Sequence, residues 1–153
     1  MIIGIGMDLV EIARIRRILE EPHGARFVER VLTPEERERA ATRGNRLAEY
    51  VAGRFAAKEA VAKALGCGIG RQVGLQDIRV VPDDRGRPCC SVSDAAWARL
   101  GYAVAAAGAA ADTATATEAS PNAGPQPAVR LHLTITHTET TAAAFVVAER
   151  DAQ

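Results

Sequence analysis

Residues 54–66 constrain the fold most, because they predict a long helix that lacks a fully polar side. The segment consists mostly of Ala, Leu, Lys, Glu and Arg, contains no proline and ends at Gly66, which can terminate a helix. Glu59 and Lys63 are spaced i, i+4 and therefore share one face, with Lys58 nearby. This pattern fits an ordinary surface ion pair. It also fits a site for a divalent metal and a polyphosphate, and the helix alone leaves both interpretations open.

The N-terminal segment supplies a second carboxylate. Residues 2–7 are apolar and partly β-branched, which predicts a buried strand, and residues 9–19 show helical spacing. Asp8 lies between them, where it could cap the helix or bind a metal. Mg²⁺ usually takes one or two carboxylates together with phosphate oxygens and water. Asp8 and Glu59 could supply the two carboxylates.

A histidine marks the end of a C-terminal strand. Residues 130–137 alternate between apolar and polar side chains, and residues 142–148 are apolar, which together predict an antiparallel hairpin. His137 stands at the strand end between Thr136 and Thr138. A histidine at such a position can be structural or solvent-exposed, and its hydroxyl neighbours also permit contact with a phosphate.

The remaining patterns predict an α+β fold in a single domain, residues 1–153, with an antiparallel or mixed sheet against a long central helix. The chain is long enough for one sizeable core and short for two domains. The other expected elements are helices at about 10–20, 24–31, 33–43 (opened by a capping box) and from 47 onward, strands near 76–82 and 87–92, and a helix capped by Ser93. Residues 101–128 are rich in Ala, Thr and Gly and predict a flexible insertion.

Composition excludes several classes of protein. Hydrophobic residues make up 48% of the chain and the formal net charge is zero, which excludes a disordered chain and gives no electrostatic case for binding nucleic acid or a membrane. Cys67, Cys89 and Cys90 form neither a disulfide framework nor a metal-ligand spacing. No membrane span or basic leader segment is evident, so we expect a cytoplasmic protein without a signal peptide.

Several strings occur in an order and spacing that resemble the bacterial holo-acyl-carrier-protein synthases, the small class of 4′-phosphopantetheinyl transferases. The most specific is Arg-Phe-Ala-Ala-Lys-Glu-Ala at residues 54–60, with Gly-x-Asp upstream at residues 6–8. The resemblance covers nearly the whole chain except about residues 101–128. The matching strings lie at residues 4–12, 27–33, 52–60 with Lys63, 66–70, 77–78, 86–88 and 135–138.

The resemblance implies a reaction in which the 4′-phosphopantetheine arm of coenzyme A moves to a serine of apo acyl carrier protein, leaving adenosine 3′,5′-bisphosphate. It implies Mg²⁺ ligands at Asp8 and Glu59 and a catalytic lysine at Lys63. Phosphoryl transfer depends mainly on positioning and electrostatic stabilisation, which suits such a set. Either Glu59 or a Mg²⁺-bound water that it orients could accept the serine proton, and the sequence leaves this choice open.

The resemblance also assigns residues to the binding of coenzyme A. Arg54, Lys58 and His137 match positions near its phosphates. Gly86 and Pro88 match a turn close to the nucleotide.

The first predicted helix is a candidate docking surface for the carrier protein. Arg14 and Arg17 lie on one face, and Arg26 follows beyond the turn. They could form a solvated face balanced by nearby glutamates, but the resemblance favours docking of an acidic carrier protein. It further implies a homotrimer with active sites between subunits and a role in fatty acid or polyketide biosynthesis. The alternative is a catalytically silent homologue that binds a carrier protein or coenzyme A.

Overall fold

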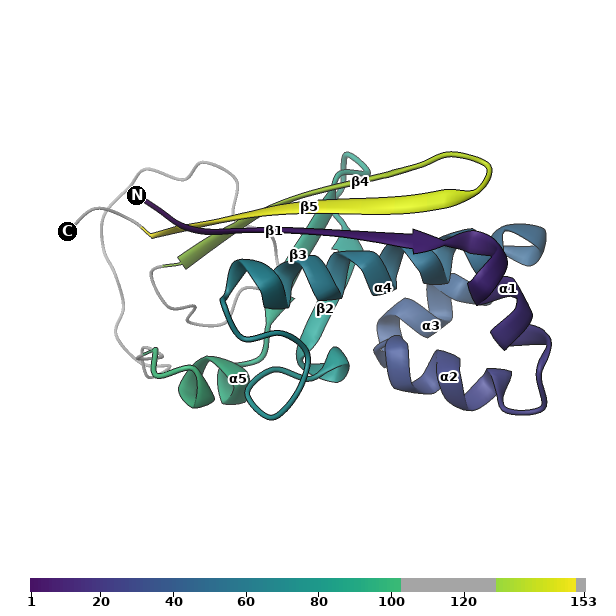
Figure 1. Ribbon diagram of the computed structural model, residues 1–153, viewed down its shortest axis with the longest axis horizontal. Coiled ribbons are helices and arrows are strands. Elements are labelled where there is room, and N and C mark those ends of the chain that lie inside the picture. The colour runs from purple at the N-terminus through teal and green to yellow at the C-terminus, as the bar shows by residue number, and fades with distance from the viewer. Residues whose placement is uncertain (103–128, 151–153) are drawn as a thin grey trace.

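The protein is described by a computed structural model for residues 1–102 and 129–150, and the statements below concern these residues. A three-stranded antiparallel sheet forms one layer (Figure 1). Its strands are β1 (Ile2–Glu11), β5 (Thr141–Arg150) and β4 (Val129–His137), in the order β1-β5-β4. The predicted C-terminal hairpin is therefore confirmed, and the N-terminal strand pairs with its returning arm.

Strand β1 is longer than its sequence pattern predicts. It continues to Glu11 instead of ending near residue 7, because its last residues pair with the start of β5, up to Glu11 opposite Thr141. Helix α1 (Ile12–Glu20) begins only after this pairing ends. Leu9 is consequently a strand residue with 60% of its surface exposed, and the helical spacing that we assigned to it was wrong.

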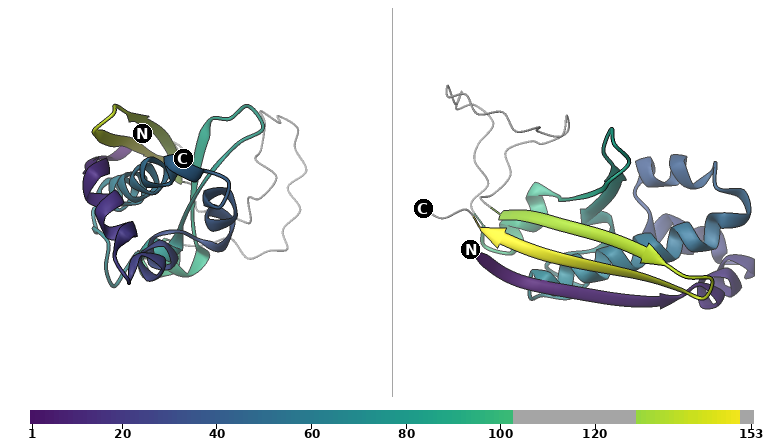
Figure 2. Two further views of the ribbon diagram at one scale, coloured as in Figure 1. Left: turned by 90° about the vertical axis from the view of Figure 1, so that its right-hand side faces the viewer. Right: turned by 90° about the horizontal axis from the view of Figure 1, so that it is seen from above.

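Helix α4 (Leu47–Ala64) is the central helix and packs against all three strands of this sheet (Figures 1 and 2). Most of its residues are buried, including alanines on every side. A helix that is apolar all round is stable only inside a protein, which explains the missing polar side in the sequence. The chain leaves the helix through Gly66, whose φ of 75° is readily adopted only by glycine.

Three shorter helices gather beside α4, namely α1, α2 (Gly24–Val31) and α3 (Pro34–Ala40). The predicted capping box of α3 is present, since the Thr33 side chain accepts from the Glu36 amide and the Glu36 carboxylate accepts from the Thr33 amide at 2.7 Å. The helix ends at Ala40 and not near residue 43. A short 3₁₀ turn, η1 (Gly44–Arg46), then leads directly into α4.

The central hairpin forms a sheet of its own. After the 3₁₀ turn η2 (Leu75–Asp77), strands β2 (Ile78–Pro82) and β3 (Pro88–Val92) pair antiparallel with each other and stay separate from the three-stranded sheet. Ser93 caps α5 (Asp94–Arg99), as predicted. Most of the predicted insertion, residues 103–128, lies outside the described residues. No helix in the described parts has the length and hydropathy needed to span a membrane.

Candidate active site

Two glycines bring the central helix into direct contact with β1. A Cβ atom on Gly4 would lie 1.9 Å from the carbonyl oxygen of Ala64, and one on Gly6 would lie 1.9 Å from that of Ala60. Side chains two apart in a strand share a face, so Asp8 points from the same side of β1 toward α4. The glycines thus place the Asp8 carboxylate close to the middle of the helix.

Asp8 meets Glu59 and Lys63 from α4. The Lys63 ammonium donates to Asp8 Oδ1 at 2.8 Å and to the carbonyl of Met7 at 3.0 Å. Burial raises the pKa of Glu59 and the negative charge of Asp8 raises it further, while Lys63 acts in the opposite direction. The hydrogen bond from Lys63 to Asp8 raises the pKa of the lysine, which therefore stays cationic near neutral pH. The structure brings the three predicted residues together: Lys63 is paired with Asp8, and the charges of both act on Glu59.

The two carboxylates of Asp8 and Glu59 suit Mg²⁺ better than a metal that takes all its ligands from the protein. The described residues contain no cluster of three or more His, Cys, Asp or Glu side chains that could hold a metal ion. Zinc sites need three or four such ligands, whereas Mg²⁺ commonly takes two carboxylates and completes its shell with phosphate oxygens and water. Burial and the negative charge of Asp8 raise the pKa of Glu59, and a divalent cation would offset the effect of that charge.

A second feature is a basic pocket at the start of α4. It has a volume of about 190 Å³ and is lined by Arg43, Arg46, Arg54 and His137, with Glu49 as the only carboxylate among the described residues that line it. His137 Nε2 lies 3.4 Å from Glu49 Oε1. We call this cavity, with the residues that line it, the arginine pocket. No side chain caps the N-terminus of α4. The unpaired backbone amides of its first turn add a partial positive charge there. The arginine pocket is suited to an anion such as phosphate.

Two of the predicted coenzyme A contacts, Arg54 and His137, line the arginine pocket. Arg54 comes from α4, and His137 is the last residue of β4. The sequence reasoning missed Arg43, Arg46 and Tyr50, which also line it. Arg43 lies just before the short 3₁₀ turn η1, and Arg46 is its last residue, and no recognisable motif marks either position. Only the local excess of arginine before the helix could have indicated them.

Lys58 does not reach this pocket, so the prediction that it contacts a phosphate needs correction. Its ammonium group is fully buried and lies 2.7 Å from Glu36 Oε2. It also donates to the carbonyls of Val31 and Leu75, at 2.6 and 3.0 Å, so all three of its N–H bonds are used inside the protein. Burial lowers the pKa of Lys58, and the charge of Glu36 opposes that effect. Lys58 ties α4 to α3.

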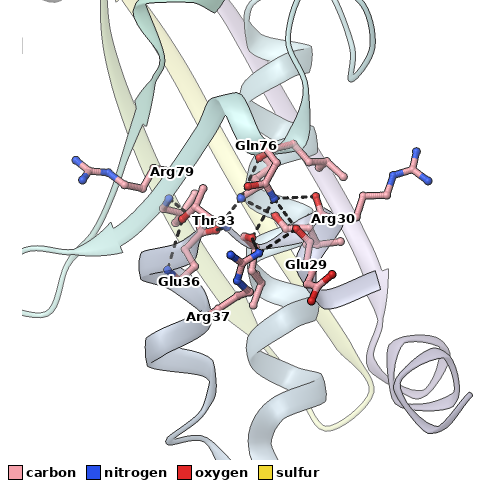
Figure 3. Close-up of polar contacts among 12 residues, drawn as sticks. Glu29, Arg30, Thr33, Glu36, Arg37, Gln76 and Arg79 are labelled. Atoms are coloured by element: carbon pink, nitrogen blue, oxygen red, sulfur yellow. Dashed lines mark hydrogen bonds and ion pairs between the residues drawn. The ribbon is translucent and has the colours of Figure 1, made fainter. Parts of the chain in front are cut away.

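The carboxylate of Glu36 is the centre of this buried network. Besides Lys58 it accepts from the amides of Thr33 and Val80, both at 2.7 Å. Figure 3 shows Thr33 and Glu36 beside Gln76, whose amide group lies within 3.0 Å of three carbonyls at the end of α2. The network joins α2, α3, α4 and β2.

Gly86 and Pro88 lie in and after the β2–β3 turn, away from the residues that line the arginine pocket. Gly86 has a φ of 81°, and its amide donates to the Asp83 carbonyl at 2.9 Å. The Asp83 carboxylate accepts from the amides of Arg85 and Arg87. In the part of the chain that the structure describes, neither Gly86 nor Pro88 lines the arginine pocket.

The predicted docking residues share one region of the surface. Arg14 and Arg17 are exposed on α1, and Arg26 is exposed on the neighbouring α2. In the parts of the chain that the structure describes, none of the three forms an ion pair or hydrogen bond through its side chain. Helix α1 begins four residues after Asp8, so this basic surface lies beside the carboxylate cluster.

Comparisons with known proteins identify the family of this chain. A sequence model of the 4′-phosphopantetheinyl transferase superfamily matches residues 4–117. A holo-[acyl-carrier-protein] synthase of Bacillus thuringiensis is 53% identical over 89 residues, which is 58% of this chain and 73% of that one.

Solved structures match over nearly the whole length. A holo-(acyl-carrier-protein) synthase from Bacillus anthracis in complex with CoA (3′,5′-ADP) has a TM-score of 0.71 at 38% identity, with 99% of each chain covered. The holo-[acyl-carrier-protein] synthase of Neisseria meningitidis has a TM-score of 0.73 at 33% identity and covers 98% of this chain and 100% of its own. The chain therefore belongs to the 4′-phosphopantetheinyl transferase superfamily.

Proposed function

We propose that this chain is a holo-acyl-carrier-protein synthase, which transfers 4′-phosphopantetheine from coenzyme A to a serine of apo acyl carrier protein. The observation that carries the proposal is the cluster of Asp8, Glu59 and Lys63 on the same chain as the arginine pocket. One part suits the reacting pyrophosphate and the other suits a further phosphate. The names of its relatives support the same activity.

Asp8 and Glu59 would hold Mg²⁺. Two carboxylates at a rigid contact between a strand and a helix fit the preference of this ion for oxygen ligands. When bound, Mg²⁺ would neutralise charge on the pyrophosphate oxygens. The role of the protein is to hold both carboxylates in place.

Lys63 would stabilise the departing phosphate. Its raised pKa keeps the ammonium group charged, and its hydrogen bonds to Asp8 and to the Met7 carbonyl fix its position. A fixed cation near developing negative charge lowers the barrier without reorganisation during the reaction. Glu59, with its raised pKa, is also our candidate to accept the serine proton.

The arginine pocket would bind a phosphate group of coenzyme A through Arg43, Arg46, Arg54 and His137. These side chains come from η1 and the residue before it, from α4 and from β4, so one anion could contact several donors. Guanidinium groups suit phosphate, because they offer several N–H donors in one plane.

The basic surface formed by Arg14, Arg17 and Arg26 would dock the carrier protein. Acyl carrier proteins are acidic, and complementary charge speeds association and orients the partner. The surface lies next to Asp8, so a docked carrier would bring its serine toward the carboxylate cluster.

We further propose a homotrimer. Ile5, Met7 and Leu9 of β1 and Phe145 of β5 form an apolar outer face on the sheet, on the side opposite α4, and each is at least 40% exposed. An exposed apolar face of this kind marks an interaction surface. A second copy of the chain is the occupant that fits, because the face is part of the sheet that carries Asp8 and could place active sites between subunits.

The test is intact-mass spectrometry of an apo acyl carrier protein incubated with this protein, coenzyme A and Mg²⁺. The expected result is a mass gain of one phosphopantetheine group that EDTA abolishes and added Mg²⁺ restores. A folded protein that binds coenzyme A but modifies none of several fatty-acid and polyketide carriers would contradict the proposal and favour a silent homologue.

A further inference from the structure

Two guanidinium groups lie against the ring of one tyrosine in the arginine pocket. The Cζ atoms of Arg43 and Arg54 are 4.8 and 4.4 Å from the centroid of the Tyr50 ring. Both distances are within the range of a cation–π contact, about 6 Å. The two arginines come from different segments of the chain. Arg43 lies just before η1, and Arg54 lies in α4, which follows η1.

The tyrosine is itself held in a fixed position. Only 8% of Tyr50 is exposed, and its hydroxyl donates to the carbonyl of Glu36 at 3.2 Å. That carbonyl belongs to α3, and the Glu36 side chain is anchored in the buried network with Lys58. The position of the Tyr50 ring is therefore fixed relative to the core.

The two arginines have no counter-charge of their own. Within the described residues neither forms an ion pair with a carboxylate, and the buried Nε atom of each lacks a hydrogen-bond partner. Two like charges on one ring repel each other, and two buried donors without partners cost free energy. An anion in the pocket would offset both costs.

We infer that Tyr50 is a positioning residue, whose ring holds Arg43 and Arg54 so that both face the same phosphate group of coenzyme A. This inference rests on the proposed function of the arginine pocket. Arginine side chains lose rotamer freedom when they bind, and a ring that already restricts them reduces that loss. Tyr50 need not touch the ligand to raise its affinity.

The first test measures binding of adenosine 3′,5′-bisphosphate by calorimetry. Replacing the ring in Tyr50→Leu is expected to raise the dissociation constant about fivefold to tenfold, the range of a partly desolvated cation–π contact. Tyr50→Phe keeps the ring and loses only the hydroxyl, so its affinity should stay within about twofold of wild type. Tyr102→Leu is the matched control, because it removes another ring that faces an arginine, Arg150, outside the pocket. It should leave binding unchanged.

The second test asks whether Tyr50 acts through the two arginines. In an Arg43→Gln/Arg54→Gln background, Tyr50→Leu should cause no further loss of affinity, because the groups that the ring positions are gone. In turnover, Tyr50→Leu alone should raise KM for coenzyme A and leave kcat within about twofold, since the contact is uniform in the ground and transition states.

Three results would overturn the inference: wild-type affinity in Tyr50→Leu, an equal loss in Tyr50→Phe, or the same loss in the background without the arginines. Failure of the wild-type protein to bind the bisphosphate would overturn it as well. The proposed activity fails differently. A protein that binds the bisphosphate but never modifies a carrier protein refutes the transfer reaction, while the binding measurements still decide the role of Tyr50.

Discussion

The backbone of Gly6 packs directly against the carbonyl oxygen of Ala60, so closely that a Cβ atom on Gly6 would lie only 1.9 Å from it. Gly6 is two residues before Asp8, and Ala60 follows Glu59. The contact therefore sets the separation of the strand that carries one carboxylate from the helix that carries the other. The proposed catalytic cluster therefore depends on a residue that has no side chain.

Gly6→Ala should push α4 away from β1. We expect the free energy of unfolding to fall by about 2 kcal/mol or more, because overpacking against a backbone cannot be relieved by a side-chain rotation. The remaining folded enzyme should require more Mg²⁺ for half-maximal turnover. Chemical denaturation and a Mg²⁺ titration of activity would measure both effects.

Gly70→Ala is a suitable control, since a Cβ there meets no atom within 4 Å and its φ is not positive. Normal stability and Mg²⁺ dependence in Gly6→Ala would show that the close approach is dispensable.

Glu59→Gln should abolish Mg²⁺-dependent turnover and make the fold slightly more stable. Burial and the charge of Asp8 raise the pKa of Glu59, so the folded protein holds this proton more tightly than the unfolded chain. Ionisation of Glu59 therefore lowers the free energy of unfolding, fully so at pH values above its raised pKa. This loss disappears once the pH falls below the ordinary pKa of a glutamate. Because Glu59 is partly exposed, the gain at pH 7 should stay below about 1 kcal/mol.

Thermal unfolding of Glu59→Gln and wild type between pH 4 and pH 8 would test this sign. The stability difference should shrink as the pH is lowered. Lower stability of the variant at pH 7 would contradict the electrostatic account, and retained turnover would remove Glu59 from the metal site.

Lys58→Met should destabilise the protein strongly without a specific effect on substrate binding. Removing one partner of a buried ion pair leaves the Glu36 carboxylate uncompensated, which typically costs about 3–5 kcal/mol. Urea denaturation measures the loss, and KM for coenzyme A of the folded fraction should remain close to wild type.

The partly exposed pair of Arg79 and Glu35 provides the control, because Arg79→Met should cost less than about 1 kcal/mol. A stable Lys58→Met protein with a greatly raised KM for coenzyme A would restore the role in phosphate binding that the sequence had indicated.

Arg14→Glu should raise KM for the carrier protein about fivefold or more and leave KM for coenzyme A nearly unchanged, because charge reversal weakens steering of an acidic partner. The effect should diminish as salt is added. Steady-state kinetics with each substrate varied in turn would measure it. Arg71→Glu makes the same charge change in the exposed loop after α4 and should have little effect. Equal changes in both KM values would argue against docking on α1.

Ile5→Glu should convert the proposed homotrimer to monomers, because it places a charge on the apolar outer face. Light scattering coupled to size-exclusion chromatography would give the mass of each variant. Ala95→Glu, on the exposed side of α5, is the control and should keep the oligomer of the wild type. A wild-type protein that is monomeric at micromolar concentration would refute the homotrimer.

The sequence alone determined the elements whose patterns are local. The capping box of Thr33 and Glu36, the apolar central helix and the C-terminal hairpin could be predicted because each depends on residues a few positions apart. The residue pattern also indicated Asp8 and Glu59 as candidate metal ligands, and family resemblance assigned Lys63 a catalytic role; the fold brings the three together.

Tertiary structure decided what depends on distant contacts. Leu9 extends a strand because β5 pairs with it, and Lys58 is buried because Glu36, 22 residues earlier, lies opposite it. The arginine pocket needs a turn, a helix and the end of β4 to meet around Tyr50. The periodicity of a sequence indicates which face of a helix or strand is apolar. Only the packing of the folded chain determines which other element covers that face and which charged side chains are buried there.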